Sequence, residues 1–123
     1  DAIAWTVNAD AKLALIAPCC HHDIQAQMNE IPEPWSLLTR NGIMKERLGD
    51  LMTDALRAQI LKLLGYRTEV IEFIGGEHTP RNIMIRAVLT NAKADPKDVE
   101  TYKKMLSDWQ IDPALASRVN LII

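Results

Sequence analysis

Two short runs in this sequence bring together side chains that can attack, bind or exchange protons. The first follows Pro18 and consists of Cys19, Cys20, His21 and His22. Thiols and imidazoles serve as nucleophiles and acid–base groups in active sites, and both also bind zinc. Four consecutive residues cannot all point at one tetrahedral ion, because zinc sites draw their ligands from spaced positions. We therefore predict no metal at this run.

The same run has a structural and a functional interpretation. In the structural one, Cys19 packs as a small buried hydrophobe and the two histidines cap the helix that follows. In the functional one, the run lies at the mouth of a site, where a thiol at a helix N-terminus beside imidazoles is activated as a nucleophile. Both interpretations stay open.

The second run is residues 77–82, Glu-His-Thr-Pro-Arg-Asn. Its Thr-Pro pair suits a polar hairpin turn, which is the structural interpretation. A turn alone does not explain why Glu77, His78, Arg81 and Asn82 flank that pair. Together they offer a carboxylate, an acid–base imidazole and a planar cation suited to anionic groups. Turn structure and function are equally good hypotheses here.

A third set of polar residues forms one side of the long predicted helix: Lys45, Glu46, Arg47, Asp50, Thr53, Asp54 and Arg57. Residues three or four apart are neighbours on a helix surface and can form ion pairs there. The pattern predicts a solvent-exposed helix face that carries several such ion pairs.

Several elements must position these residues. The apolar run Lys12–Ala17 predicts a strand buried on both faces, as in a parallel sheet. Residues 2–11 resemble the late part of a helix that leads into this strand. We predict a short helix over Asp23–Asn29 and a loop over Glu30–Ser36, where Pro32 and Pro34 break the chain.

The second half of the chain predicts a long helix, a hairpin and two further helices. Apolar residues recur at spacings of three and four from Met44, and Gly65 suits the position just past the helix end. The stripe consists of Met44, Leu48, Leu51, Met52, Ala55, Leu56, Ile60, Leu63 and Leu64. Strands over 66–74 and 82–90 should pair antiparallel, because their connection is too short for a crossover helix. Pro96–Trp109 predicts a helix capped by Asp95, and a small helix should begin near Asp112.

Composition narrows the class of protein. At 123 residues, with 48% hydrophobic and 24% charged residues, the chain has the balance of one globular domain. A net charge of −2 supplies no general basic field for a polyanion, although a local patch would be enough to bind RNA. No apolar run is long enough to span a membrane. The adjacent cysteines suit a reducing compartment, so we expect a cytoplasmic protein.

Three stretches together resemble the last third of S-adenosylmethionine-dependent methyltransferase domains, in particular tRNA ribose methylases and related predicted RNA methylases. The stretches are residues 17–22 (Ala-Pro-Cys-Cys-His-His), residues 46–57 (with Glu-Arg-Leu-Gly-Asp and Thr-Asp-Ala-Leu-Arg) and residues 77–82. They cover most of residues 10–90, and their combination is more specific than any one alone.

The resemblance implies an α/β fold, namely the C-terminal half of a Rossmann-like methyltransferase sheet. Its strands five to seven would end in an antiparallel hairpin with flanking helices, and Lys12–Ala17 would be the fifth strand. Residues 1–123 would form the C-terminal fragment of one domain, whose N-terminal half carries the glycine-rich turn for the cofactor. This sequence has no G-x-G-x-x-G motif. We therefore expect the fragment to bind S-adenosyl-L-methionine weakly or not at all, and to be inactive alone.

The resemblance also implies roles for individual residues. His21 or His78 would be the general base, Glu77 would orient a histidine, and Cys19 and Cys20 would line the pocket. The substrate-binding set would be His22, Arg47, Arg81 and Asn82, with the arginines placing an anionic substrate such as an RNA phosphate.

Two other classes of function remain open. One is a non-catalytic interaction or accessory domain, and the other is a thiol- or metal-dependent protein that uses residues 19–22. We also expect the isolated chain to form a homodimer. Its strand Lys12–Ala17 would be an edge without protective charges after Lys12, and such an edge recruits a partner.

Overall fold

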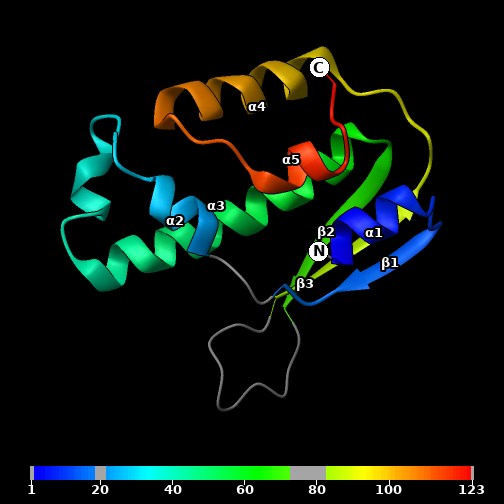
Figure 1. Ribbon diagram of the computed structural model, residues 1–123, viewed down its shortest axis with the longest axis horizontal. Coiled ribbons are helices and arrows are strands. Elements are labelled where there is room, and N and C mark those ends of the chain that lie inside the picture. The colour runs from blue at the N-terminus through cyan, green and yellow to red at the C-terminus, as the bar shows by residue number, and fades with distance from the viewer. Residues whose placement is uncertain (1, 19–21, 73–82, 123) are drawn as a thin grey trace.

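The computed structural model describes residues 2–18, 22–72 and 83–122, and Figure 1 shows their arrangement. Helices and strands follow one another in nearly the predicted order. The elements are α1 (Ala2–Asn8), β1 (Leu13–Ile16), α2 (His22–Gln27), the 3-10 helix η1 (Trp35–Leu38), α3 (Gly42–Leu63), β2 (Tyr66–Glu72), β3 (Ile83–Leu89), α4 (Pro96–Trp109) and α5 (Ala114–Arg118). The result is a mixed α/β domain with a small sheet and flanking helices.

The sheet has three strands in the order β1-β3-β2 among the described residues. The predicted hairpin is confirmed: β2 pairs antiparallel with β3, with Val70 opposite Ile85. On its other side β3 pairs antiparallel with β1, with Ile16 opposite the same Ile85. Because β1 and β2 are both antiparallel to β3, they run parallel to each other. The strand that comes last in the sequence thus lies between the other two.

The two faces of this sheet differ. On the helix face, which we define by Ala14, Ile85 and Ala87, side chains are buried and join the core with α1 and α3. On the open face, which includes Leu13 and Leu15, those two leucines are 57% and 59% exposed. The prediction of a strand buried on both faces is therefore wrong for this structure. Alternate side chains point to opposite faces, and only one face of β1 is packed against described helices.

The long helix α3 confirms the predicted element but only half of its stripe. Met52, Leu56, Ile60 and Leu63 are buried, whereas Leu51 is 61% exposed. Met44 and Ala55, two further members of the predicted stripe, are exposed too, and Leu48 and Leu64 are half-buried. Met44 lies in the first turn of α3, before the part of the helix whose side chains enter the core, and Leu48 is the first stripe residue that packs against that core.

Capping residues explain where the later helices begin and end. Gly65 follows the C-cap of α3 with a φ of 93°, a left-handed conformation that glycine adopts without steric cost. Asp95 caps α4, since its side chain accepts a hydrogen bond from the Lys97 backbone N–H at 2.9 Å. Pro96 then occupies the first turn of that helix. These three predictions are confirmed.

In the described parts of the chain, no helix combines the length and the apolar character needed to cross a membrane.

Candidate functional site

Most of the predicted site residues lie outside the residues that the structure describes. These are Cys19, Cys20, His21, Glu77, His78, Arg81 and Asn82. His22 begins α2, but its side chain is not described. Arg47 lies on α3 and is exposed to solvent. The proposed proximity of His21 and His78 therefore stays a prediction.

The described strands nevertheless show where the chain leads into both motifs. Ile16 near the end of β1 and Val70 near the end of β2 both lie opposite Ile85 of β3. Since β1 and β2 run in the same direction, Pro18 and Glu72 leave the sheet at the same end. Residues 19–22 follow the first of these exits, and residues 77–82 follow the second at a distance of a few residues.

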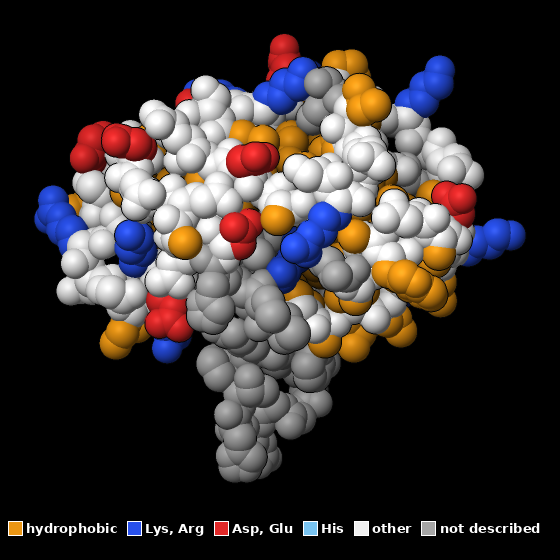
Figure 2. All heavy atoms as spheres, viewed as in Figure 1, with side chains coloured by type: hydrophobic (Ala, Val, Ile, Leu, Met, Phe, Trp, Pro, Cys, Tyr) orange, Lys and Arg blue, Asp and Glu red, His pale blue; other side chains and the backbone are white. Residues whose placement is uncertain are grey.

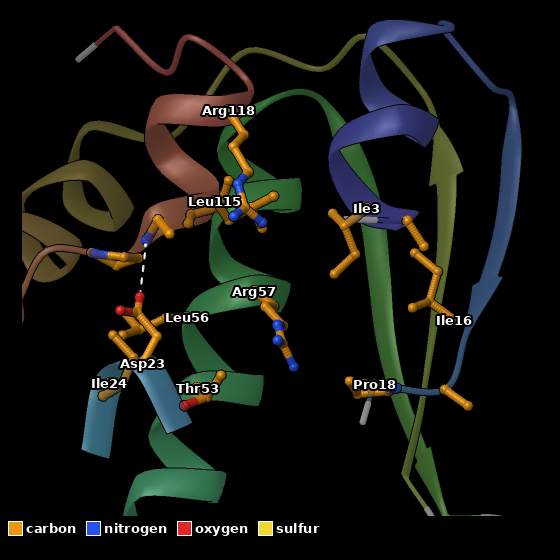
Figure 3. A pocket seen from close by; sticks show the side chains of 15 residues that line it. Ile3, Ile16, Pro18, Asp23, Ile24, Thr53, Leu56, Arg57, Leu115 and Arg118 are labelled. Carbon is orange, nitrogen blue, oxygen red and sulfur yellow. Dashed lines mark hydrogen bonds between the residues drawn. The ribbon is translucent and has the colours of Figure 1, made fainter. Parts of the chain in front are cut away.

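A pocket of about 550 Å³ opens at this end of β1, between α1, α2, α3 and α5 (Figure 3). Aliphatic side chains form most of its wall, and five of them are almost fully buried: Ile3, Ile24, Leu56, Ile60 and Leu115. Ile16, Ala17 and Pro18 form the wall on the β1 side. The polar lining consists of Asp23, Thr53, Arg57 and Arg118.

Hydrogen bonds connect α2, on one side of the pocket, to the start of α5 and to the residues just before it. Asp23 accepts one from the Ala114 backbone N–H at 3.4 Å, drawn as a dashed line in Figure 3. Gln27 binds Asp112 twice: its Oε1 accepts from the backbone N–H at 2.6 Å, and its Nε2 donates to the carbonyl at 3.0 Å. These contacts hold the walls in place although they come from distant parts of the sequence.

The α3 side of the pocket carries a largely buried ion pair. Arg57 Nη1 lies 3.3 Å from Asp54 Oδ1, and the two side chains are only 15% and 9% exposed. Thr53 is also buried and donates a hydrogen bond to the Gly49 carbonyl at 2.6 Å. The predicted solvated face is therefore wrong for Thr53 and Asp54. The i, i+3 spacing of Asp54 and Arg57 correctly predicts their pairing, but it carries no information on burial.

Arg118 is the pocket residue that sequence reasoning missed. It lies in the last turn of α5 and lines the pocket from the side opposite α2. In the sequence it is one arginine in a short helix near the C-terminus, and no motif marks it. Only the packing of α5 beside α1 and α3 brings it to the pocket.

Two tyrosines away from the pocket have raised pKa values, and their hydroxyl groups differ in hydrogen bonding. Burial, and then the charge of Asp10, raises the pKa of Tyr66, whose hydroxyl donates to the Ala11 carbonyl at 3.0 Å. Burial, and then Asp112, raises the pKa of Tyr102. The Tyr102 hydroxyl is buried and has no hydrogen-bond partner within the described structure.

The described residues favour binding over chemistry at the pocket. Within the described ranges, no three His, Cys, Asp or Glu residues come together as a metal site would require. The polar groups that line the pocket are suited to holding a charged ligand in an apolar cavity.

Comparison of the chain with protein-family models, curated proteins and solved structures found no match in any of the three.

Proposed function

We propose that this chain is the acceptor-side part of an S-adenosylmethionine-dependent methyltransferase domain, with β1, β2 and β3 as its fifth, sixth and seventh strands. The observation that carries the proposal is the parallel relation of β1 and β2. It brings the exits toward residues 19–22 and 77–82 to one end of the sheet. In open α/β sheets, ligands bind beyond the carboxyl ends of the parallel strands. Residues 19–22 and 77–82, which carry the family resemblance, therefore follow strands that end where a ligand site is expected in such a sheet.

The residues of this chain do not fit the cofactor by themselves. Binding of a nucleoside cofactor at such a sheet uses a glycine-rich turn and an acidic residue after an early strand. The sequence contains no G-x-G-x-x-G motif. The proposal therefore requires cofactor-binding strands from outside residues 1–123, on the edge of β1 that pairs with no described strand. We propose that the complete domain works in the cytoplasm.

Within this proposal, the chain binds the methyl acceptor and removes its proton. His21 or His78 acts as the general base, Glu77 orients a histidine, and Cys19 and Cys20 line the site. His22, Arg47, Arg81 and Asn82 contact the acceptor, for which RNA is the first candidate. Removal of a general base typically lowers the rate by about 10²–10⁴-fold.

The test uses the complete gene product and S-adenosylmethionine labelled on its methyl group, with total RNA as the acceptor. We expect His78→Gln to lower methyl transfer at least about 100-fold with an unchanged melting temperature. Thr101→Ser, on the exposed side of α4, is the control and should behave as wild type. Failure of the complete product to bind S-adenosylmethionine would contradict the proposal. Binding without transfer to RNA would redirect it to another acceptor.

One observation favours a non-catalytic interaction domain as the second candidate. Five large apolar side chains of η1 and the first turn of α3 are exposed: Trp35, Leu37, Leu38, Ile43 and Met44. A contiguous exposed apolar patch commonly marks a protein contact. A complete gene product that binds no methyl donor, yet loses a stable protein partner on Ile43→Lys, would support this candidate over the enzyme.

The thiol- or metal-dependent alternative depends wholly on residues 19–22. Metal analysis of the purified chain tests it directly. About one zinc per chain, lost in a Cys19→Ser/Cys20→Ser variant, would support this alternative. The methyltransferase proposal predicts no bound zinc.

A further inference from the structure

The pocket at the end of β1 has the features of a ligand site. Its volume of about 550 Å³ lies within the range of small-molecule pockets. Its wall is mostly apolar, and the few polar groups come from three different helices, α2, α3 and α5. Ligand pockets typically combine a dominant apolar lining with a small number of placed polar groups.

The apolar wall favours an aliphatic ligand. Isoleucine, leucine, alanine and proline make up its apolar part, and no aromatic side chain is present among the described lining residues. Nucleobases are bound preferentially by stacking on aromatic rings or guanidinium planes, and the apolar part of the described wall supplies neither. A flexible or branched hydrocarbon packs against aliphatic side chains more closely than a planar ring does.

The charged groups favour a single negative charge. Figure 3 shows Arg57 extending from α3 into the space that Ile3 and Ile16 bound on the other side. Arg118 enters from α5 above it. A guanidinium presents five N–H donors in a planar fork that matches a carboxylate and can serve several acceptors together. The charged residues of the described lining are Asp23, Arg57 and Arg118, so its formal charge of about +1 matches one negative charge better than the two of a phosphate.

We propose that this pocket binds a small aliphatic carboxylate, with its hydrocarbon part among the isoleucine, leucine and proline side chains and its carboxylate group against Arg57 and Arg118. The inference goes beyond the methyltransferase proposal and does not depend on it. Binding is measured on the 123-residue chain without a methyl donor, so either idea can fail alone.

Isoleucine methyl groups provide the readout, because Ile3, Ile16, Ile24 and Ile60 line the pocket. Ile43 and Ile122 are exposed elsewhere and serve as internal controls. The probe is 4-methylpentanoate, titrated while methyl NMR spectra are recorded. We expect saturable shifts of the four pocket methyl groups with a Kd of about 1 mM or tighter. The neutral isostere 4-methylpentanamide should bind at least about tenfold more weakly, because it lacks the charge-assisted hydrogen bonds.

Two variants test the two cations, and a third serves as the control. Arg118→Gln removes an exposed charge, and Arg57→Lys keeps the charge beside Asp54 but loses the planar fork. Each should weaken binding of the carboxylate about five- to tenfold. The control Arg67→Gln makes the same chemical change on the exposed side of β2, away from the pocket, and should leave the Kd unchanged.

Four results would overturn the inference. The first is the absence of saturable pocket shifts up to about 20 mM probe, well above the affinity expected for a ligand of this size. The second is equal affinity for the carboxylate and the amide, and the third is shifts of equal size at Ile43 and Ile122. Tighter binding of inorganic phosphate than of 4-methylpentanoate would also contradict the proposed ligand class.

Discussion

The helix face and the open face of the sheet are built from the same three strands but differ in how far their side chains are buried. Ile85 and Ala87 on the helix face are fully buried, whereas Leu13 and Leu15 on the open face are more than half exposed. On β2 and β3 the open face is partly charged, and Arg86 Nη1 lies 3.4 Å from Glu69 Oε2 there. On the open face, β2 therefore presents charged side chains to solvent, whereas β1 presents leucines.

Figure 2 shows hydrophobic side chains gathered on the side of the molecule where β1 lies. Trp5 of α1, 73% exposed, is a further large apolar side chain in this part of the chain. A strand that is apolar on both faces is typical of a sheet covered on both sides. Both faces of β1 are apolar enough to be covered, but the described residues cover only one of them.

The largest expected effect comes from truncation on the helix face. Ile85→Ala should lower the free energy of unfolding by about 2–5 kcal/mol, because it leaves a cavity in the core. Leu15→Ala, on the open face of the neighbouring strand, should change it by no more than about 0.5 kcal/mol. Urea unfolding of both variants measures the difference. Equal losses would mean that the open face is covered in solution.

A homodimer would provide such cover, and its loss is the next largest effect. We expect the wild-type chain to be a dimer at micromolar concentration, with β1 or α1 at the contact. Leu13→Glu/Leu15→Glu should raise the dimer Kd at least about 30-fold, because a two-fold axis brings like charges together. Light scattering across a dilution series measures this. A wild-type monomer would show that the edge of β1 needs no partner.

A smaller effect is expected from the hydrogen-bonded tyrosine. Tyr66→Phe removes the hydrogen bond to the Ala11 carbonyl, which ties the start of β2 to the turn before β1. The free energy of unfolding should fall by about 0.5–1.5 kcal/mol. Thermal and urea unfolding should agree on this value, and an unchanged stability would mean that water replaces the lost donor.

The smallest effect at neutral pH is expected at Tyr102, whose hydroxyl lacks a partner among the described residues. Tyr102→Phe should leave stability unchanged or raise it by up to about 1 kcal/mol, because it removes a buried unsatisfied group. In the wild type, the raised pKa means that the folded state holds the Tyr102 proton more tightly than the unfolded state. Stability should therefore be complete below the ordinary tyrosine pKa and should fall as the pH rises through the folded-state value.

Unfolding experiments at alkaline pH measure whether the free energy of unfolding falls in this way. The Tyr102→Phe chain should lose less stability than wild type between about pH 9 and pH 11, around the ordinary tyrosine pKa of about 10. An identical alkaline profile for the two chains would contradict the role assigned to Tyr102.

The elements of the fold were largely predictable from the sequence because their signals are local. Asp95 determines a helix end through its side chain, and Pro96 and Gly65 do so through their backbone conformation, so all three act locally. The hairpin followed from a short connection between two apolar runs. By contrast, the exposure of Leu51 and Leu15 depends on which distant elements reach them, and periodicity does not contain that information.

The candidate site was predictable to a lesser degree. Reactive residue types mark positions 19–22 and 77–82, yet those positions lie outside the described residues, so their roles stay predictions. The pocket was not predicted, because Asp23, Arg57 and Arg118 meet only through the packing of α2, α3 and α5. Residues that meet only through helix packing have no regular spacing in the sequence by which they could be recognised.

The central position of β3 also has a consequence for synthesis on the ribosome. Val88 pairs with Leu13, yet it emerges about 75 residues later, which at about 5–20 residues per second means several seconds. During that time β1 lacks β3, the strand with which it pairs in the folded sheet, so its backbone groups on that side have no strand partner. Because the pairing partners are far apart in sequence, sheet closure should be a late and comparatively slow step of folding. We expect the interval before β3 emerges to be the time when the unpaired edge of β1 is most prone to association with other chains.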